Sequence, residues 1–160
     1  MLRHLSFTLL VALLICGCTK KHDERLLWAF ATGDVVPTCP AVAGDGALYV
    51  GSHDKKLYRL QPDGTLDWRF VTGDYVHGSP TVDADGMVFF GSFDHHVYAL
   101  DPNGQERWRF KTGDKVATSP ALGVDDALYL ASDDGVLYCL DRLAGELRWQ
   151  VKAQGPLSSS

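Results

Sequence analysis

Four tryptophans divide this chain into units of about forty residues. Trp28, Trp68, Trp108 and Trp149 are spaced by 40, 40 and 41 residues, and other residue types recur in the same register. The recurring residues are Gly33, Gly73 and Gly113, then Pro40, Pro80 and Pro120, then Tyr58, Tyr98 and Tyr138. A fixed period of this length indicates a repeat architecture in which every unit is one supersecondary structure.

Each unit predicts four short strands joined by tight turns. The second and third strands of the first unit, at 48–52 and 57–60, are continuous apolar runs, which are typical of strands covered on both faces. The last strand differs, because in 66–70 the apolar Leu, Trp and Phe alternate with Asp and Arg. Such alternation indicates an outermost strand with one buried and one solvated face. The turns contain glycine after Asp, Asn or Pro-Asp, which favours tight reversals.

These units resemble the PQQ-like (BamB-like) β-propeller repeat family over residues 26–160. The shared pattern comprises Leu-x-Trp-x-Phe, Thr-Gly-Asp, Ser-Pro-Ala/Thr-Val/Leu, Leu-Tyr-Val-Gly-Ser and Leu-Tyr-x-Leu-Asp. WD40 propellers have a similar period, but their Gly-His start and Trp-Asp end are missing from these units. The resemblance implies an all-β fold, a β-propeller of four-stranded antiparallel blades with about three blades present and the ring incomplete.

In the family's register, residues 26–31 form an outer strand without a blade of its own. Blades are then expected at about 36–71, 76–111 and 116–152, and residues 153–160 begin a fourth. Family propellers are closed rings of seven or eight blades, which three blades cannot form. We therefore expect a truncated member of a longer lipoprotein rather than several chains assembled into a ring, because the chain ends within a strand, just before the expected repeat proline.

Residues 1–17 predict a lipoprotein signal peptide. A short basic start precedes the apolar run 5–15, which is shorter than the roughly 20 residues that a membrane-spanning helix needs. The run ends in Ile15-Cys16-Gly17-Cys18, which looks like a bacterial lipobox. This resemblance implies cleavage before Cys18 and lipidation of its thiol and new amino group, followed by a tether over 18–25. An ordinary signal peptide or an uncleaved anchor is the alternative.

The charge and the cysteines narrow the function classes further. The net charge is −5 and the pI is about 5.6, whereas nucleic-acid-binding proteins carry a basic surface patch. The charge therefore argues against nucleic-acid binding. Cys39 and Cys139 occupy non-equivalent positions of different units, so we interpret them as small apolar fillers. A disulfide bridge between them is the alternative, since an oxidising compartment would allow it.

Quinone chemistry is the enzymatic hypothesis that the resemblance raises. Quinoprotein dehydrogenases hold the quinone and a calcium ion at the propeller centre with carboxylate and amide ligands, often beside paired cysteines. Here no two cysteines are adjacent, the single asparagine Asn103 falls in a turn, and all four tryptophans occupy the outer-strand position. We therefore predict no catalytic and no cofactor-binding residues. A fragment of a PQQ-dependent dehydrogenase remains the alternative.

A metal site is a second chemical hypothesis. Titratable residues occupy equivalent turns of neighbouring units: His53, Asp54, Asp94, His95 and His96. If these turns share a rim, they could hold a transition metal. The third unit has Asp133-Asp134 without a histidine, and solvated polar turns explain the pattern on their own, so we predict no metal site.

The expected function is consequently non-catalytic. We expect a membrane-anchored propeller that serves as a protein-binding scaffold or sensor in the bacterial cell envelope, and we do not expect an enzyme. Its partners would be the membrane, through the lipid on Cys18, and other envelope proteins, with no cofactor and no nucleic acid. The location would be extracytoplasmic, in the periplasm and at the outer membrane if the cell is Gram-negative.

Overall fold

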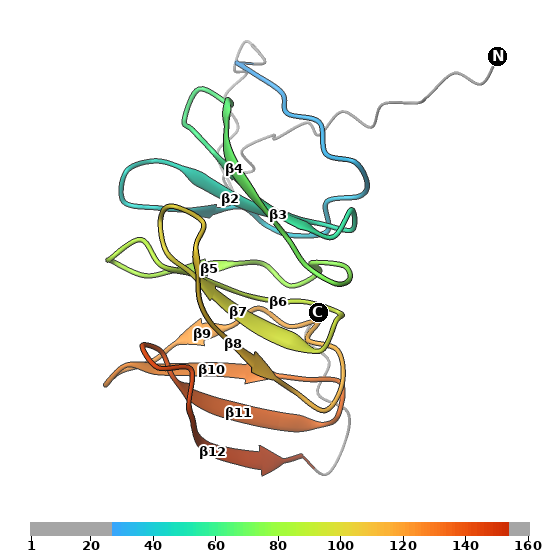
Figure 1. The fold of residues 1–160 in the computed structure, drawn as a ribbon, viewed down its shortest axis with the longest axis vertical. Helices are drawn as coiled ribbons and strands as arrows, with labels where there is room; N and C mark the ends of the chain where they lie inside the picture. Colours follow the sequence, from blue (N-terminus) through green and yellow to red (C-terminus); the bar gives the residue numbers. More distant parts are fainter. Residues whose placement is uncertain (1–26, 154–160) are drawn as a thin grey trace, which may run out of the picture.

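Three four-stranded antiparallel sheets are stacked one above another along the long axis of the molecule (Figure 1). The computed structural model describes residues 27–153. The strands, blade by blade, are β1 (Ala41–Val42), β2 (Leu48–Ser52), β3 (Lys56–Leu60) and β4 (Leu66–Val71); β5 (Thr81–Val82), β6 (Val88–Gly91), β7 (His96–Leu100) and β8 (Glu106–Lys111); β9 (Ala121–Leu122), β10 (Ala127–Ala131), β11 (Val136–Asp141) and β12 (Leu147–Lys152). The predicted all-β fold with three propeller blades and an open ring is confirmed.

Within each blade the strands follow one another in sequence order, so that every pairing is a simple antiparallel hairpin. The third strand slips by one residue against the fourth at the same place in all blades. The slips lie between Arg59 and Leu60, between Ala99 and Leu100, and between Cys139 and Leu140. A bulge of this kind bends a strand and strengthens its twist. The repeat in sequence is therefore a repeat in backbone detail as well.

The hydrophobic core lies between the blades rather than within one of them. One cluster combines Tyr49 and Leu57 of the first blade with Val88 and Phe90 of the second, all fully buried. A second cluster joins the second and third blades in the same way. Because each middle strand is covered on both faces, its sequence is a continuous apolar run. The half-buried Trp68 packs against the first cluster from β4, as the alternation in that strand predicted.

An indole hydrogen bond joins each blade to the outer segment or strand that precedes it. The Nε1–H group donates to a carbonyl oxygen in the last turn of the next blade, from Trp28 to Pro62 at 3.1 Å, from Trp68 to Pro102 at 2.9 Å and from Trp108 to Arg142 at 2.9 Å. Residues 27–31 thus hold Trp28 against the first blade in the way that β4 and β8 hold Trp68 and Trp108 against the blades that follow them. The hypothesis that the tryptophans pack between blades is confirmed for Trp68 and Trp108, while Trp28 contacts the first blade alone.

The outer face of the third blade is less covered than those of the other two. Leu137 is 36% exposed, whereas its equivalents Leu57 and Val97 are fully buried, and Trp149 is 43% exposed. No further blade follows within residues 27–153. The predictions for the signal peptide 1–17, for Cys18 and the tether, and for residues 154–160 lie outside the described residues. No helix in the described part of the chain is long and apolar enough to cross a membrane.

Candidate functional site

Loops and turns of all three blades meet along one rim. We define the rim as the loops that enter the blades, 33–37, 73–77 and 113–117, with the turns between second and third strands, 52–55, 92–95 and 132–135. One backbone hydrogen bond ties loop to turn in each blade. It runs from the N–H of His53, Phe93 and Asp133 to the carbonyl oxygens of Val35, Tyr75 and Lys115, each at 2.9 Å. The rim therefore has the same backbone frame three times over.

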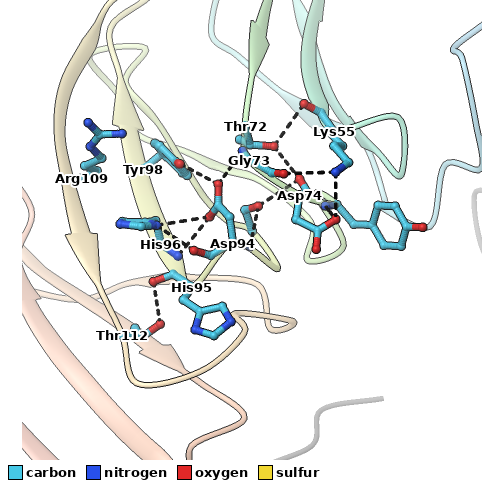
Figure 2. A network of polar contacts seen from close by, with 12 residues as sticks. Lys55, Thr72, Gly73, Asp74, Asp94, His95, His96, Tyr98, Arg109 and Thr112 are labelled. Carbon is cyan, nitrogen blue, oxygen red and sulfur yellow. Dashed lines mark hydrogen bonds and ion pairs between the residues drawn. The ribbon is translucent and has the colours of Figure 1, made fainter.

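An aspartate at the centre of each turn fastens this frame. Asp94 Oδ2 accepts hydrogen bonds from the Gly73 N–H at 2.7 Å and from the Tyr98 hydroxyl at 2.8 Å (Figure 2). Asp54 and Asp134 make the same contacts, with Gly33 and Tyr58 and with Gly113 and Tyr138. We call this arrangement the aspartate staple. It gives Asp54 and Asp94, two of the residues in the metal hypothesis, a structural role.

The electrostatics of the staple are those of a fixed carboxylate beside a neutral phenol. Burial acts to raise the pKa of Asp134, but hydrogen bonds from Tyr138, Val136 and Gly113 outweigh it, so the pKa lies below its ordinary value of 3.8. The pKa of Asp54 is lowered in the same way, with burial opposed by Tyr58, Gly33 and Lys56. Burial and the neighbouring carboxylate raise the pKa of Tyr138 to about 12. Neither group is poised to exchange a proton near neutral pH, so the staple is no acid–base centre.

Side chains that differ between blades stand on this repeated frame. Four sets of equivalent positions differ in all three blades: Val35, Tyr75 and Lys115; Pro37, His77 and Ala117; His53, Phe93 and Asp133; Lys55, His95 and Gly135. At the junction of the first two blades these positions bring four rings together. We name His53, Tyr75, His77 and Phe93 the rim cluster.

The rings of the rim cluster contact one another directly. The His53 and Tyr75 rings are stacked, with centroids 4.5 Å apart and planes at 13°. His53 Nε2 lies 2.9 Å from His77 Nδ1, and the Phe93 centroid lies 5.1 Å from that of His77. The Lys115 ammonium lies 5.2 Å from the Phe93 centroid, in the arrangement of a cation–π contact. Tyr75 is 37% exposed, so part of this aromatic surface faces solvent.

The other histidines of the metal hypothesis point elsewhere. His96 Nδ1 lies 2.8 Å from the Asp94 carbonyl oxygen, and His95 Nε2 lies 3.8 Å from Asp114 Oδ1. Within residues 27–153 no group of three or more His, Cys, Asp or Glu side chains is close enough to hold one ion. His77, the neighbour of His53, was missed because its equivalents are proline and alanine. A comparison of the entry loops, position by position, is the signal that could have found it.

The two cysteines within residues 27–153, Cys39 and Cys139, are free, and only one of them is the apolar filler that the sequence predicted. Cys139 is buried in β11, 1% exposed. Cys39 is exposed, so the interpretation of this residue as a buried filler is wrong. Its backbone N–H donates to Ser79 Oγ at 2.9 Å, and the Ser79 N–H donates to Ser119 Oγ at 2.9 Å. Residue 39 therefore lies in a ladder of entry-loop contacts that runs from blade to blade, with its side chain outside the core.

Arginines neutralise the carboxylates beside the first hairpin of two blades. Arg59 pairs with Asp45 and Asp67 and donates from Nε to the Tyr49 hydroxyl at 3.2 Å. In the third blade, Arg142 pairs with Asp83 across the junction and with Asp126. A shallow hollow borders Arg142. With its carboxylates engaged by a cation, this region favours a structural ion pair over a ligand site.

Comparison with known proteins matches the chain to one family model. The family model described as outer membrane protein assembly factor BamB matches residues 17–102 and 93–160. Among curated proteins, no sequence match is found. The model match covers nearly the whole chain, including residues on both sides of the rim.

Solved structures share the fold. The crystal structure of BamB from Moraxella catarrhalis matches with a TM-score of 0.67 and 21% identity, over 79% of this chain and 39% of that one. A europium-containing methanol dehydrogenase matches with a TM-score of 0.69 and 24% identity, over 82% of this chain and 27% of that one. The chain thus spans well under half the length of either structure. The fold is shared by BamB, which the family model describes as an assembly factor, and by a dehydrogenase. The fold alone therefore does not distinguish an assembly role from an enzymatic one.

Proposed function

The chain belongs to the family described as outer membrane protein assembly factor BamB, and from this premise we propose that it is a non-catalytic, membrane-anchored β-propeller. Its role would be that of a protein-binding scaffold or sensor in the bacterial cell envelope. The lipid on Cys18 would hold it at the membrane, extracytoplasmically. In a Gram-negative cell this places it at the outer membrane, facing the periplasm.

The rim cluster is the observation that carries the binding role. Residues that repeat in all units fill junctions, turns and staples, so their presence is explained by folding. Folding does not explain Tyr75, His77 and Phe93 in this way, because the equivalent positions of the other blades carry different residues on the same backbone frame. Those residues include Val35, Pro37, Lys115 and Asp133. A partly exposed group of aromatic rings on a rigid frame is the composition of a protein-binding hot spot.

The chemistry of the rim also favours binding over catalysis. The pKa values of Asp54 and Asp134 are lowered and that of Tyr138 is raised, so at neutral pH the carboxylates stay charged and the phenol stays neutral. A nucleophile beside a base is the usual sign of covalent catalysis. The rim cluster instead offers stacked rings with the Lys115 ammonium group beside Phe93, and such groups recognise a partner through contact.

Site-specific photo-crosslinking tests the binding role. A photoreactive phenylalanine analogue at Tyr75 should capture a discrete envelope protein in intact cells, while the same analogue at Leu143, 59% exposed in the last turn of the third blade, should not. Tyr75→Ala and Phe93→Ala should each reduce co-purification of that protein at least tenfold. Equal capture at both positions would contradict the proposal.

A quinone titration tests the enzymatic alternative. Pyrroloquinoline quinone with Ca²⁺ should leave the tryptophan fluorescence of the purified protein unchanged, and dye-linked alcohol oxidation should be undetectable. Tight quinone binding would instead assign the chain to the dehydrogenases.

Membrane anchoring has a test of its own. Cys18→Ser should move the protein from the membrane fraction to the soluble fraction and abolish incorporation of labelled palmitate. Cys16→Ser is the matched control, because a small residue at this position is compatible with the lipobox pattern. Loss of labelling in both variants would point to a defect in export instead.

A further inference from the structure

The outer edges of the second and third blades are basic, and from this charge we propose that they lie on an anionic lipid surface. The cations are Arg107, Arg109 and Lys111 of β8 with Arg148 and Lys152 of β12, and we name them the basic edge. The inference rests on the membrane anchoring put forward under the proposed function. It adds an orientation, in which the lipid holds the chain at the membrane and the basic edge turns two blades toward the headgroup phosphates.

Charge is distributed unevenly over the chain. The outer strands β4, β8 and β12 contain six of its fifteen Lys and Arg residues but two of its twenty Asp and Glu residues. The net charge of the whole chain is −5, so the positive excess on the outer strands is local. Exposed charges more than about 8–10 Å apart are largely screened at physiological ionic strength. An anionic surface that approaches this edge therefore meets a positive field in spite of the negative net charge.

The cations of the basic edge lie on the same side of their strands. In β8, the three cations alternate with Trp108 and Phe110, which are half-buried and pack against the core between the second and third blades. In β12, Arg148 and Lys152 alternate in the same way with Trp149. Successive side chains of a strand point to opposite faces, so all five cations point away from the tryptophan side, and all are exposed. β8 and β12 are edge strands of neighbouring sheets (Figure 1).

Three cations of the basic edge have no carboxylate partner within residues 27–153. They are Arg107, Lys111 and Lys152. The other two are paired, Arg109 with Glu106 at 3.3 Å and Arg148 with Asp141 at 2.7 Å. An unpaired cation can contact a phosphate without first breaking an ion pair. Each of the three should therefore strengthen binding to an anionic membrane by about fivefold.

Apolar side chains beside the basic edge favour a lipid surface over a soluble polyanion. On the other side of β12, Trp149 is 43% exposed and Val151 is 57% exposed. Tryptophan is enriched where a membrane meets water, and apolar groups at that interface add to the electrostatic attraction of anionic lipids. A soluble polyanion offers no apolar layer for these side chains. The combination of cations and exposed apolar groups on one strand is therefore that of a membrane-contacting surface.

Amine labelling of the lipid-anchored full chain tests the orientation. The protein is reconstituted in vesicles of phosphatidylethanolamine and phosphatidylglycerol, or of phosphatidylcholine alone, and acetylated with a water-soluble reagent. Lys111 and Lys152 should react about fivefold more slowly in the anionic vesicles, and high salt should remove this protection. Lys55, exposed on a turn of the first blade, should react equally in both. Equal rates in the two vesicle types at all three lysines would overturn the proposal.

Charge removal provides a matched comparison that does not depend on the lipid. In the full chain with Cys18→Ser, Lys111→Gln and Lys152→Gln should each lower partitioning into the anionic vesicles about fivefold. Lys55→Gln removes the same charge and should leave partitioning unchanged. An equal loss from Lys55→Gln would show a response to net charge alone and would contradict the basic edge, as would unchanged partitioning of the two β12 and β8 variants. Circular dichroism establishes that the variants are folded.

The two membrane proposals fail in different ways. If Cys18 is not lipidated, labelled palmitate is not incorporated, while partitioning of the Cys18→Ser chain still responds to Lys111→Gln. If the basic edge does not contact lipid, palmitate is incorporated as before and partitioning no longer depends on phosphatidylglycerol.

Discussion

Gly104 lies directly beneath the indole ring of Trp68. A Cβ atom on Gly104 would fall 2.8 Å from Trp68 Cδ2, and the residue has a φ of +79°. The same pair recurs as Gly64 beneath Trp28 and, one residue later in register, as Gly145 beneath Trp108. Glycine is required here twice over, because the left-handed backbone disfavours side chains and the indole occupies the space that a side chain would need.

Gly104→Ala should lower the free energy of unfolding by about 2–3 kcal/mol, since a left-handed non-glycine residue costs about 1–3 kcal/mol and the methyl group must also displace an indole.

Gly135→Ala separates the two effects, because Gly135 has the same φ of +79° but open space around its Cβ. It should cost only about 1 kcal/mol. Gly44→Ala, with open space and no positive φ, should stay within about 0.5 kcal/mol of wild type. Urea unfolding followed by tryptophan fluorescence gives all three values; equal losses at 104 and 135 would mean that the indole moves aside freely.

Tyr98→Phe should destabilise the fold by about 1–2 kcal/mol. The substitution keeps the ring that packs against Phe70 and Phe90 but removes the hydroxyl that donates to Asp94 at 2.8 Å. The Asp94 carboxylate would then keep the Gly73 N–H and lose a charge-assisted bond. Tyr75→Phe, on the partly exposed rim, is the matched control and should change the thermal midpoint very little. A similar loss from both variants would argue against the staple.

The staple also predicts a particular dependence of stability on pH. The pKa of Asp134 is lowered in the folded state, so its carboxylate stabilises the fold above the ordinary value of 3.8, and this contribution is lost as the pH falls through the folded-state pKa. Asp134→Asn should therefore be less stable than wild type at pH 7, and the difference should shrink below pH 3.8. Glu146→Gln, an exposed carboxyl in the last turn of the same blade, should show no such convergence. Chemical unfolding across this pH range would reveal a constant difference for Asp134→Asn if the staple carried no charge.

Thiol labelling should distinguish the two cysteines of the described chain. In the native protein a maleimide should modify the exposed Cys39 within minutes and leave the buried Cys139 unmodified. Cys139 should react only at the rate of unfolding, because its thiol is excluded from solvent. Peptide mapping by mass spectrometry assigns each site, and Cys39→Ser serves as the control. Protection of both cysteines under non-reducing conditions alone would indicate a disulfide bridge.

Much of the fold could be predicted because its determinants are local to each unit. Alternation in 66–70 identified the outer strand, and glycine after Asp, Asn or Pro-Asp identified the turns, since both depend on residues a few positions apart. The site was predicted less well. His53 was grouped with His95 and His96, because a repeat reveals which residues are equivalent. It does not reveal which non-equivalent residues meet across a junction, and so His77 was missed.

Trp28 and Trp149 show most clearly which features follow from local sequence and which depend on the packing of the blades. The blade, its four strands and the outer position of every tryptophan follow from the sequence alone, because strand alternation and turn conformation are properties of short segments. The three-dimensional arrangement is needed to explain why Trp28 reaches the Pro62 carbonyl while Trp149 stays 43% exposed, and why His53 meets His77. Those outcomes depend on how one sheet stacks on the next. Stacking is set by the packing of apolar faces from distant parts of the chain, and the side chains that differ between units are carried into contact by it.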